Sequence, residues 1–147
     1  MQYIGMAEPF KETSAWHLFE EANVILGYNL VELLQYGPEE KLHKTEYAQP
    51  AVFVSCIALW ELHRENLEPQ LFLGHSLGEV TAFAAAGAFS FADGVRLAAA
   101  RGKFMGEQQG GMLAVLGLDE DCLSEICRDI RENHFVAVAN LNCPGQV

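Results

Sequence analysis

The sequence predicts an α/β domain in which a short buried strand turns directly into a helix. The apolar run Leu71-Phe72-Leu73 ends at Gly74, and the alanine-rich segment 80–88 follows it. Two more apolar runs, 112–116 and 135–139, stand on either side of a helical pattern at 120–131. Short apolar runs that alternate with helical patterns are typical of α/β folds, so we expect strands at all three runs.

Helical patterns account for most of the first 110 residues. Glycine or proline punctuation bounds them, and Pro50 suits the first turn of a helix, where its missing N–H costs nothing. Ser90, three residues ahead of Asp93, is typical of a capping box that begins a further helix. The expected helices cover residues 14–26, 30–35, 51–64, 80–88 and 91–107, whereas 39–45 is expected to be polar and exposed.

The composition favours a globular domain and argues against nucleic acid as a partner. The chain has 147 residues, of which 50% are hydrophobic, enough for a packed core. Its formal net charge is -11, and only nine residues are Lys or Arg. Binding to nucleic acid rests on clustered cations that neutralise phosphates, so this function class is excluded.

The cysteines and the hydropathy pattern indicate a cytoplasmic protein. The four cysteines form no C-x-x-C pair and have no histidine at zinc-ligand spacing, so we expect reduced thiols and no metal site. The chain does not open with a signal peptide, and its apolar stretches are too short to span a bilayer. We therefore expect no membrane association.

The predicted strands lack partners within the chain. Residues 71–73 form the only strand expected before residue 110, and a buried strand needs neighbours that satisfy its N–H and C=O groups. The unit of strand, helix and strand at 112–139 likewise lacks a further element to cover its sheet. The simplest interpretation is a fragment that lacks sequence at both ends.

The pattern Gly74-x-Ser76-x-Gly78 predicts a nucleophile elbow. The glycines let the chain turn sharply between strand and helix, so that the serine hydroxyl stands clear of its neighbours. A serine at a helix N-terminus also sits among free N–H groups, which stabilise the oxyanion formed by attack on an ester or thioester. We expect the N–H of Leu77 to be the first such donor.

None of the five histidines is a convincing base for Ser76. His75 adjoins the serine, but neighbouring side chains on a tight turn point apart, so we expect it to shape the elbow. The other four are expected on solvated surfaces: His17, His43, His63 and His134. We therefore expect the general base to lie outside this chain.

Arg101 is the second residue that carries chemical information. At 100° per residue it lies among Leu97, Phe104 and Met105 and away from the polar face of its helix, so it is expected to face inward. A buried guanidinium needs a partner, and its fork suits a carboxylate. That carboxylate would belong either to a structural Asp or Glu or to a substrate, and position alone does not separate the two.

Several motifs together resemble the malonyl-CoA:acyl-carrier-protein transacylases of fatty-acid synthesis and the acyltransferase domains of polyketide synthases. The principal runs are GHSLGE at 74–79 and RGKFM at 101–105. Weaker matches are QYIGM at 2–6, which resembles the end of the family's opening G-Q-G-S-Q-x-x-G-M, GPEE at 37–40, QPA at 49–51 and ANLNCPGQV at 139–147.

The resemblance implies a role for each matched residue. Ser76 would accept the acyl group, Leu77 would donate its N–H to the oxyanion, and Arg101 would bind the free carboxylate of malonyl. Gln49 and His75 would line the substrate pocket. Malonyl would pass from coenzyme A to Ser76 and then to the phosphopantetheine thiol of an acyl carrier protein, with no cofactor.

The family's fold is an α/β-hydrolase-like core with an inserted ferredoxin-like subdomain. The resemblance therefore implies a partial core at 1–110 and the first part of the insert at 111–147. The glutamine that completes the family's oxyanion hole would precede this chain and the catalytic histidine would follow it, so we expect the isolated chain to be inactive or nearly so.

Two alternative functions remain at this point. A serine hydrolase or thioesterase of the α/β-hydrolase type would share the elbow but has no need of an inward Arg101. A non-catalytic fragment would keep part of the fold without turnover. The sequence does not separate a fatty-acid enzyme from a polyketide enzyme, nor malonyl from methylmalonyl.

Overall fold

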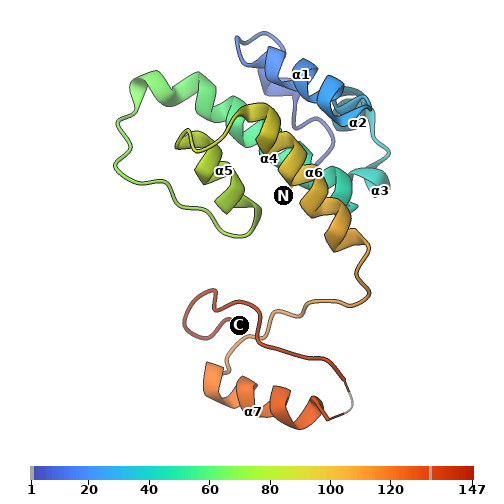
Figure 1. Ribbon diagram of the computed structural model, residues 1–147, viewed down its shortest axis with the longest axis vertical. Helices are drawn as coiled ribbons and strands as arrows, with labels where there is room; N and C mark the ends of the chain where they lie inside the picture. The colour runs from blue at the N-terminus through green and yellow to red at the C-terminus, as the bar shows by residue number, and fades with distance from the viewer. Residues whose placement is uncertain (1, 133) are drawn as a thin grey trace. The chain divides into compact units, whose positions relative to one another are not determined.

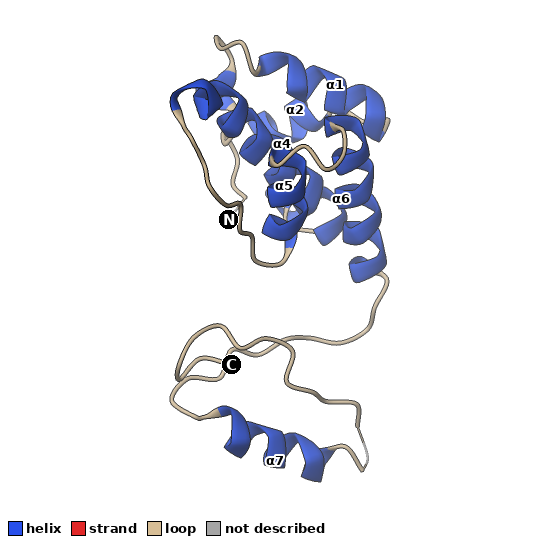
Figure 2. Cartoon of the chain, turned by 60° about the vertical axis from the view of Figure 1, so that its left-hand side comes forward, coloured by secondary structure: helices blue, strands red, loops and turns tan. Residues whose placement is uncertain are grey.

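A computed structural model describes residues 2–132 and 134–147 and divides the chain into two compact units, Met1–Gln109 and Gly110–Val147. Helices and loops make up both units, and no strand occurs among the described residues (Figure 2). The helical segments are η1 (Glu8–Phe10), α1 (Trp16–Leu26), α2 (Leu30–Tyr36), α3 (Glu39–Leu42), α4 (Thr45–His63), η2 (Arg64–Asn66), α5 (Leu77–Ala85), α6 (Phe91–Gly106) and α7 (Glu120–Ile130).

The first unit is organised by α4, which crosses α6 and also contacts α5 (Figure 1). Glycines on α6 allow a close crossing. A Cβ at Gly94 would overlap the ring of Phe53, and one at Gly102 would overlap the backbone of Thr45. The Thr45 hydroxyl also donates to the carbonyl oxygen of Gly102 at 2.8 Å. The crossing therefore fixes the N-terminal half of α4 against α6 between Gly94 and Gly102.

The hydrophobic core of this unit is formed by α1, α2, α4 and α6. Its largest fully buried side chains include Phe19 of α1, Leu30 and Leu34 of α2, and Phe53 of α4. Burying a side chain of this size contributes about 1.5–3 kcal/mol. This core gives the helices that carry the candidate site a rigid support.

The helix predictions are largely confirmed. Gly27 ends α1 in the left-handed conformation, and the Ser90 hydroxyl accepts the N–H of Asp93 at 3.1 Å as the capping box requires. One prediction was wrong: α4 begins at Thr45, so that Pro50 lies inside the helix rather than in its first turn. The polar segment 39–45 is largely exposed as expected, although it contains the short helix α3, whose Leu42 is buried.

The prediction of a buried strand at Leu71–Leu73 was wrong. The segment is a loop in which Leu71 and Leu73 are 71% and 83% exposed. None of its backbone groups forms a hydrogen bond within the described residues. Phe72 alone packs, edge-on against Trp60 with 5.2 Å between ring centroids. A strand forms only beside another strand, and no residue that the structure describes pairs its backbone with this segment.

The second unit contains the predicted helix but neither predicted strand. Residues 135–139 form a loop in which Phe135 is 97% exposed. The other expected strand, at 112–116, forms no strand either, although its end pairs with the C-terminal residues, where Val115 and Val147 exchange N–H to carbonyl bonds of 2.8 and 3.1 Å. Few backbone groups pair in this way, so the end of 112–116 and the C-terminal residues form only isolated antiparallel bridges.

No helix in the described part of the chain is long and apolar enough to cross a membrane.

Candidate active site

Ser76 lies on a sharp turn between the loop at 71–75 and α5. It is the one described residue other than glycine with positive φ, at φ 56° and ψ -116°. This conformation costs an ordinary residue about 1–3 kcal/mol and is typical of functional turns. The elbow predicted from the glycine pattern is therefore present, although a loop rather than a strand leads into it.

The two glycines of the elbow contribute differently to this turn. A Cβ at Gly74 would overlap the backbone carbonyl of Gly78, whereas one at Gly78 would meet nothing within 4 Å. Gly74 is required because the chain passes directly over the first turn of α5. Gly78 has no such steric requirement.

Neither the hydroxyl of Ser76 nor the N–H of Leu77 is taken up by hydrogen bonding within α5. Ser76 occupies the N-cap position but forms no side-chain capping bond. Gly78 and Glu79 donate their N–H groups to the carbonyls of His75 and Ser76 at 2.9 and 3.2 Å. Leu77 opens the helix, so its N–H has no acceptor within the helix. The helix dipole adds partial positive charge at the same end.

Arg101 joins α6 to both α4 and the elbow. One terminal nitrogen donates to Oε1 of Gln49 at 2.6 Å, and the other donates to Oγ of Ser76 at 3.0 Å. The structure thus brings together Gln49, Ser76 and Arg101, all of which were predicted from the sequence. Ser76 and Gln49 lie 25 and 52 positions before Arg101 in the chain.

The environment of Arg101 bears on the two partners considered from the sequence. Among the described residues no carboxylate lies within 4.0 Å of the guanidinium. Arg101 is half-buried and faces α4 and the elbow, but Leu97, Phe104 and Met105 beside it stay 46%, 65% and 44% exposed. The arginine is therefore inward without belonging to the core, and no internal ion pair explains it.

Gln49 supports Arg101 from the buried side of α4. It is only 7% exposed, and its Nε2 donates to the sulfur of Met105 at 3.0 Å. Met105 had no individual role in the sequence interpretation. The sequence signal that could have indicated its role is its position four residues after Arg101, because residues four apart share one face of a helix.

The histidines offer no base. All five are exposed, which confirms the surface positions expected for His17, His43, His63 and His134. Ser76 has one side-chain partner among the described residues, and it is Arg101. His75 adjoins the serine, but its imidazole makes no hydrogen bond in the described part of the chain.

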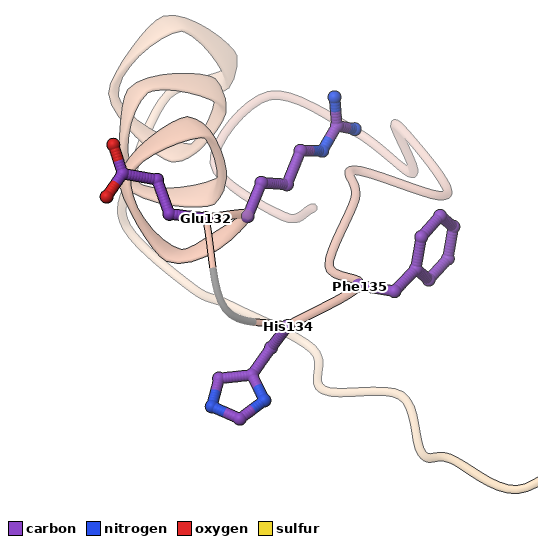
Figure 3. A pocket seen from close by; sticks show the side chains of 4 residues that line it. Glu132, His134 and Phe135 are labelled. Atoms are coloured by element: carbon purple, nitrogen blue, oxygen red, sulfur yellow. The ribbon is translucent and has the colours of Figure 1, made fainter.

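The structure contains a hollow in each unit. One runs beside the elbow between the loop and α5, lined by Gln70, Leu71, Phe72, Leu73, Gly74, Glu79, Ala82, Phe83 and Ala86. The other lies in the second unit around Arg131, Glu132, His134 and Phe135. Its three labelled side chains point away from one another (Figure 3). Nε of Arg131 is already bonded to the carbonyl of Val136 at 2.8 Å, so this hollow offers no convergent set of groups.

The turn at Ser76, with a helix following and free N–H groups around it, places the chain in the nucleophile-elbow class of proteins. The chain belongs to the acyl transferase domain family, which matches residues 7–147. The family that the motifs predicted is thereby confirmed.

Known relatives agree with this assignment. The malonyl CoA-acyl carrier protein transacylase of Salmonella typhimurium is 44% identical over 135 residues, which are 88% of this chain and 44% of that protein. The solved structure of the malonyl CoA-acyl carrier protein transacylase from Coxiella burnetii has a TM-score of 0.90 at 35% identity and covers 99% of this chain and 48% of that one.

A third relative was solved with its partner. It is a malonyl-transacylase in complex with a type II PKS acyl-carrier protein, with a TM-score of 0.86 at 35% identity, and the match covers 99% of this chain and 50% of that one. The chain therefore spans about half the length of the relatives that it matches. The acyltransferase fold is confirmed for that half.

Proposed function

We propose that the chain forms the nucleophile half of an acyltransferase that moves malonyl from malonyl-CoA to the phosphopantetheine thiol of an acyl carrier protein. One observation carries this proposal. The guanidinium of Arg101 has no carboxylate partner among the described residues and lies 3.0 Å from the hydroxyl of Ser76. A substrate carboxylate held there would bring the rest of the acyl group to the serine.

In the first half-reaction Oγ of Ser76 attacks the thioester carbonyl, and its proton passes to a base outside the described residues. The tetrahedral oxyanion accepts the N–H of Leu77, and the carbon–sulfur bond then breaks. Coenzyme A leaves as the thiol with the proton from the base, so Ser76 carries malonyl as an ester. In the second half-reaction the carrier thiol attacks this ester and Ser76 regains its proton.

Arg101 selects substrates that carry a free carboxylate. Its planar fork binds a carboxylate through two parallel hydrogen bonds, and its neutral partners Gln49 and Ser76 leave its charge uncompensated. Gln49 and His75 would line the substrate pocket, as the family resemblance implies. An acetyl group offers nothing for Arg101 to bind, so we expect malonyl to be loaded in preference.

Gly111–Val147 would be the first part of a ferredoxin-like subdomain. Helix α7 is amphipathic, with Leu123 buried and Ile126 and Ile130 on the same face still 43% and 44% exposed. Such a face normally covers a sheet. The runs at 112–116 and 135–139 are suited to supply its strands once further strands lie beside them.

The test uses an acyltransferase of full family length that carries residues 1–147 unchanged. It is mixed with malonyl-CoA and its intact mass is recorded. We expect a malonyl adduct that is absent after Ser76→Ala, and an adduct that survives this change would refute the role of Ser76. Release of free malonate without an adduct that the carrier thiol accepts would instead indicate a hydrolase.

The 147-residue chain alone is the matched control. We expect it to form little or no adduct under the same conditions, because none of its histidines is hydrogen-bonded to Ser76 and it offers only one evident oxyanion donor. Loss of a single such donor typically costs about 10²- to 10³-fold in rate. Rapid loading of the isolated chain would show that a base within it had been overlooked.

A further inference from the structure

The side-chain amide of Gln49 has a defined orientation in this site. A guanidinium carries only donors, so the atom that faces Arg101 at 2.6 Å must be the amide oxygen. The amide nitrogen must then point the other way, where it meets the sulfur of Met105 at 3.0 Å. Both ends of the amide are therefore occupied by residues of α6.

The sulfur matters because Gln49 is nearly closed off from solvent. At 7% exposure its NH₂ group has little access to water, and a buried donor without an acceptor is costly. A thioether is a weak acceptor, but it is the side-chain acceptor that this nitrogen finds in the described part of the chain. Without it, the amide would turn toward solvent or a backbone carbonyl and away from Arg101.

Met105 lies four residues after Arg101, so both side chains stand on one face of α6. The amide of Gln49, which comes from α4, bridges them. The helix crossing beneath is fixed by the bond from Thr45 to the carbonyl of Gly102, at 2.8 Å. The helix that carries Gln49 is therefore held in place, and the amide contacts Arg101 at one end and Met105 at the other.

We propose that Met105 is a positioning residue: its sulfur holds the amide of Gln49 in the orientation that keeps Arg101 directed at Ser76. This inference rests on the proposed malonyl transfer, because the property it sets is the preference for acyl groups with a free carboxylate. Met105 itself need not touch the substrate. It acts through Gln49 on the guanidinium.

The functional test uses the full-length acyltransferase with Met105→Leu, which keeps the volume but removes the acceptor. KM and kcat are measured for malonyl-CoA and acetyl-CoA. We expect KM for malonyl-CoA to rise about two- to tenfold, the range for one hydrogen bond, and the malonyl-to-acetyl preference to fall equally. Met105→Gln restores an acceptor and should recover much of the preference. Met6→Leu, a methionine outside the site, is the control and should change neither.

Two results would overturn the inference: an unchanged preference in Met105→Leu, or a loss that Met105→Gln does not repair, since the latter indicates packing alone. A second measurement needs no activity. In the isolated chain, the side-chain NH₂ protons of Gln49 should exchange with solvent faster in Met105→Leu and more slowly again in Met105→Gln. Equal exchange in all three proteins would exclude the sulfur contact even if malonyl transfer itself proved wrong.

Discussion

Gly74 and Gly78 belong to one motif, yet the structure predicts opposite effects for the same substitution at each. In Gly74→Ala the new Cβ would overlap the carbonyl carbon and oxygen of Gly78 and the nitrogen of Glu79. Nonbonded carbon atoms rest about 3.5–4.0 Å apart. All three obstructing atoms are backbone, so no side chain can move aside, and the first turn of α5 must shift. We expect a loss of about 3 kcal/mol or more in unfolding free energy.

Gly78→Ala supplies the matched control. The added methyl meets nothing within 4 Å, and the position lies in the first turn of α5. Replacing glycine by alanine in a helix typically stabilises it by about 0.5–1 kcal/mol. Urea unfolding followed by tryptophan fluorescence is the assay, because Trp16 and Trp60 both lie in the first unit and Trp60 packs on Phe72 beside the elbow. Equal losses in the two variants would refute the steric reasoning.

Three further predictions concern the elements around the site. Gln49→Glu would place a carboxylate against Arg101 in place of the amide oxygen at 2.6 Å, so malonyl-to-acetyl loading by the full-length enzyme should fall roughly tenfold. Ser90→Ala should cost about 1 kcal/mol of unfolding free energy at neutral pH. The hydrogen bond from Ser90, together with Arg96, lowers the pKa of Asp93 below 3.8. The ionised Asp93 therefore stabilises the fold above pH 3.8, and this contribution is lost as the pH falls through the lowered pKa. NMR titration of Asp93 should show a higher pKa in Ser90→Ala, and an unchanged pKa would contradict the capping role. Gly102→Ala should separate α4 from α6 and destabilise the first unit by about 3 kcal/mol, because its Cβ would also lie 2.9 Å from Cα of Glu46, and unchanged urea unfolding would show that the crossing can relax.

Local signals predicted the helices well. The left-handed Gly27 and the Ser90 cap are properties of a few adjacent residues, and such signals act wherever the segment is placed. Pro50 shows the limit of this approach. Its preference for a first turn was outweighed by the packing of residues 45–49 against α6, which extended α4 toward the N-terminus.

The strands could not be predicted from local signals because their stability depends on partners. The apolar run at 71–73 has the composition of a strand, but its backbone groups have no neighbouring strand to bond. Its Leu73 is left 83% exposed. Residues 112–116 and 135–139 have the same difficulty in the second unit. None of these runs forms a strand in the described part of this chain, and strands there are expected only in a longer chain that supplies their partners.

The site residues that could be predicted are those marked by a pattern in the residues next to them in the sequence. Ser76 followed from a pattern of five residues, and Arg101 followed from helical periodicity. Gln49 came only from the family resemblance, because nothing in its own surroundings marks it in the sequence. Its contact with Arg101 spans 52 positions and depends on the crossing of α4 and α6. Met105 was missed because a thioether contact has no sequence signature of its own.

The charge of the chain makes the surroundings of Arg101 informative. There are 20 acidic residues against nine Lys and Arg, so a carboxylate partner for a half-buried arginine would be easy to supply. Lys11, Arg64 and Arg96 each have one three residues away along the chain. Arg101 instead has an amide oxygen and a hydroxyl, two neutral acceptors that hold its direction without cancelling its charge. A guanidinium kept in this way has its strongest available interaction still unmade, and a substrate that brings its own carboxylate to Ser76 would complete it.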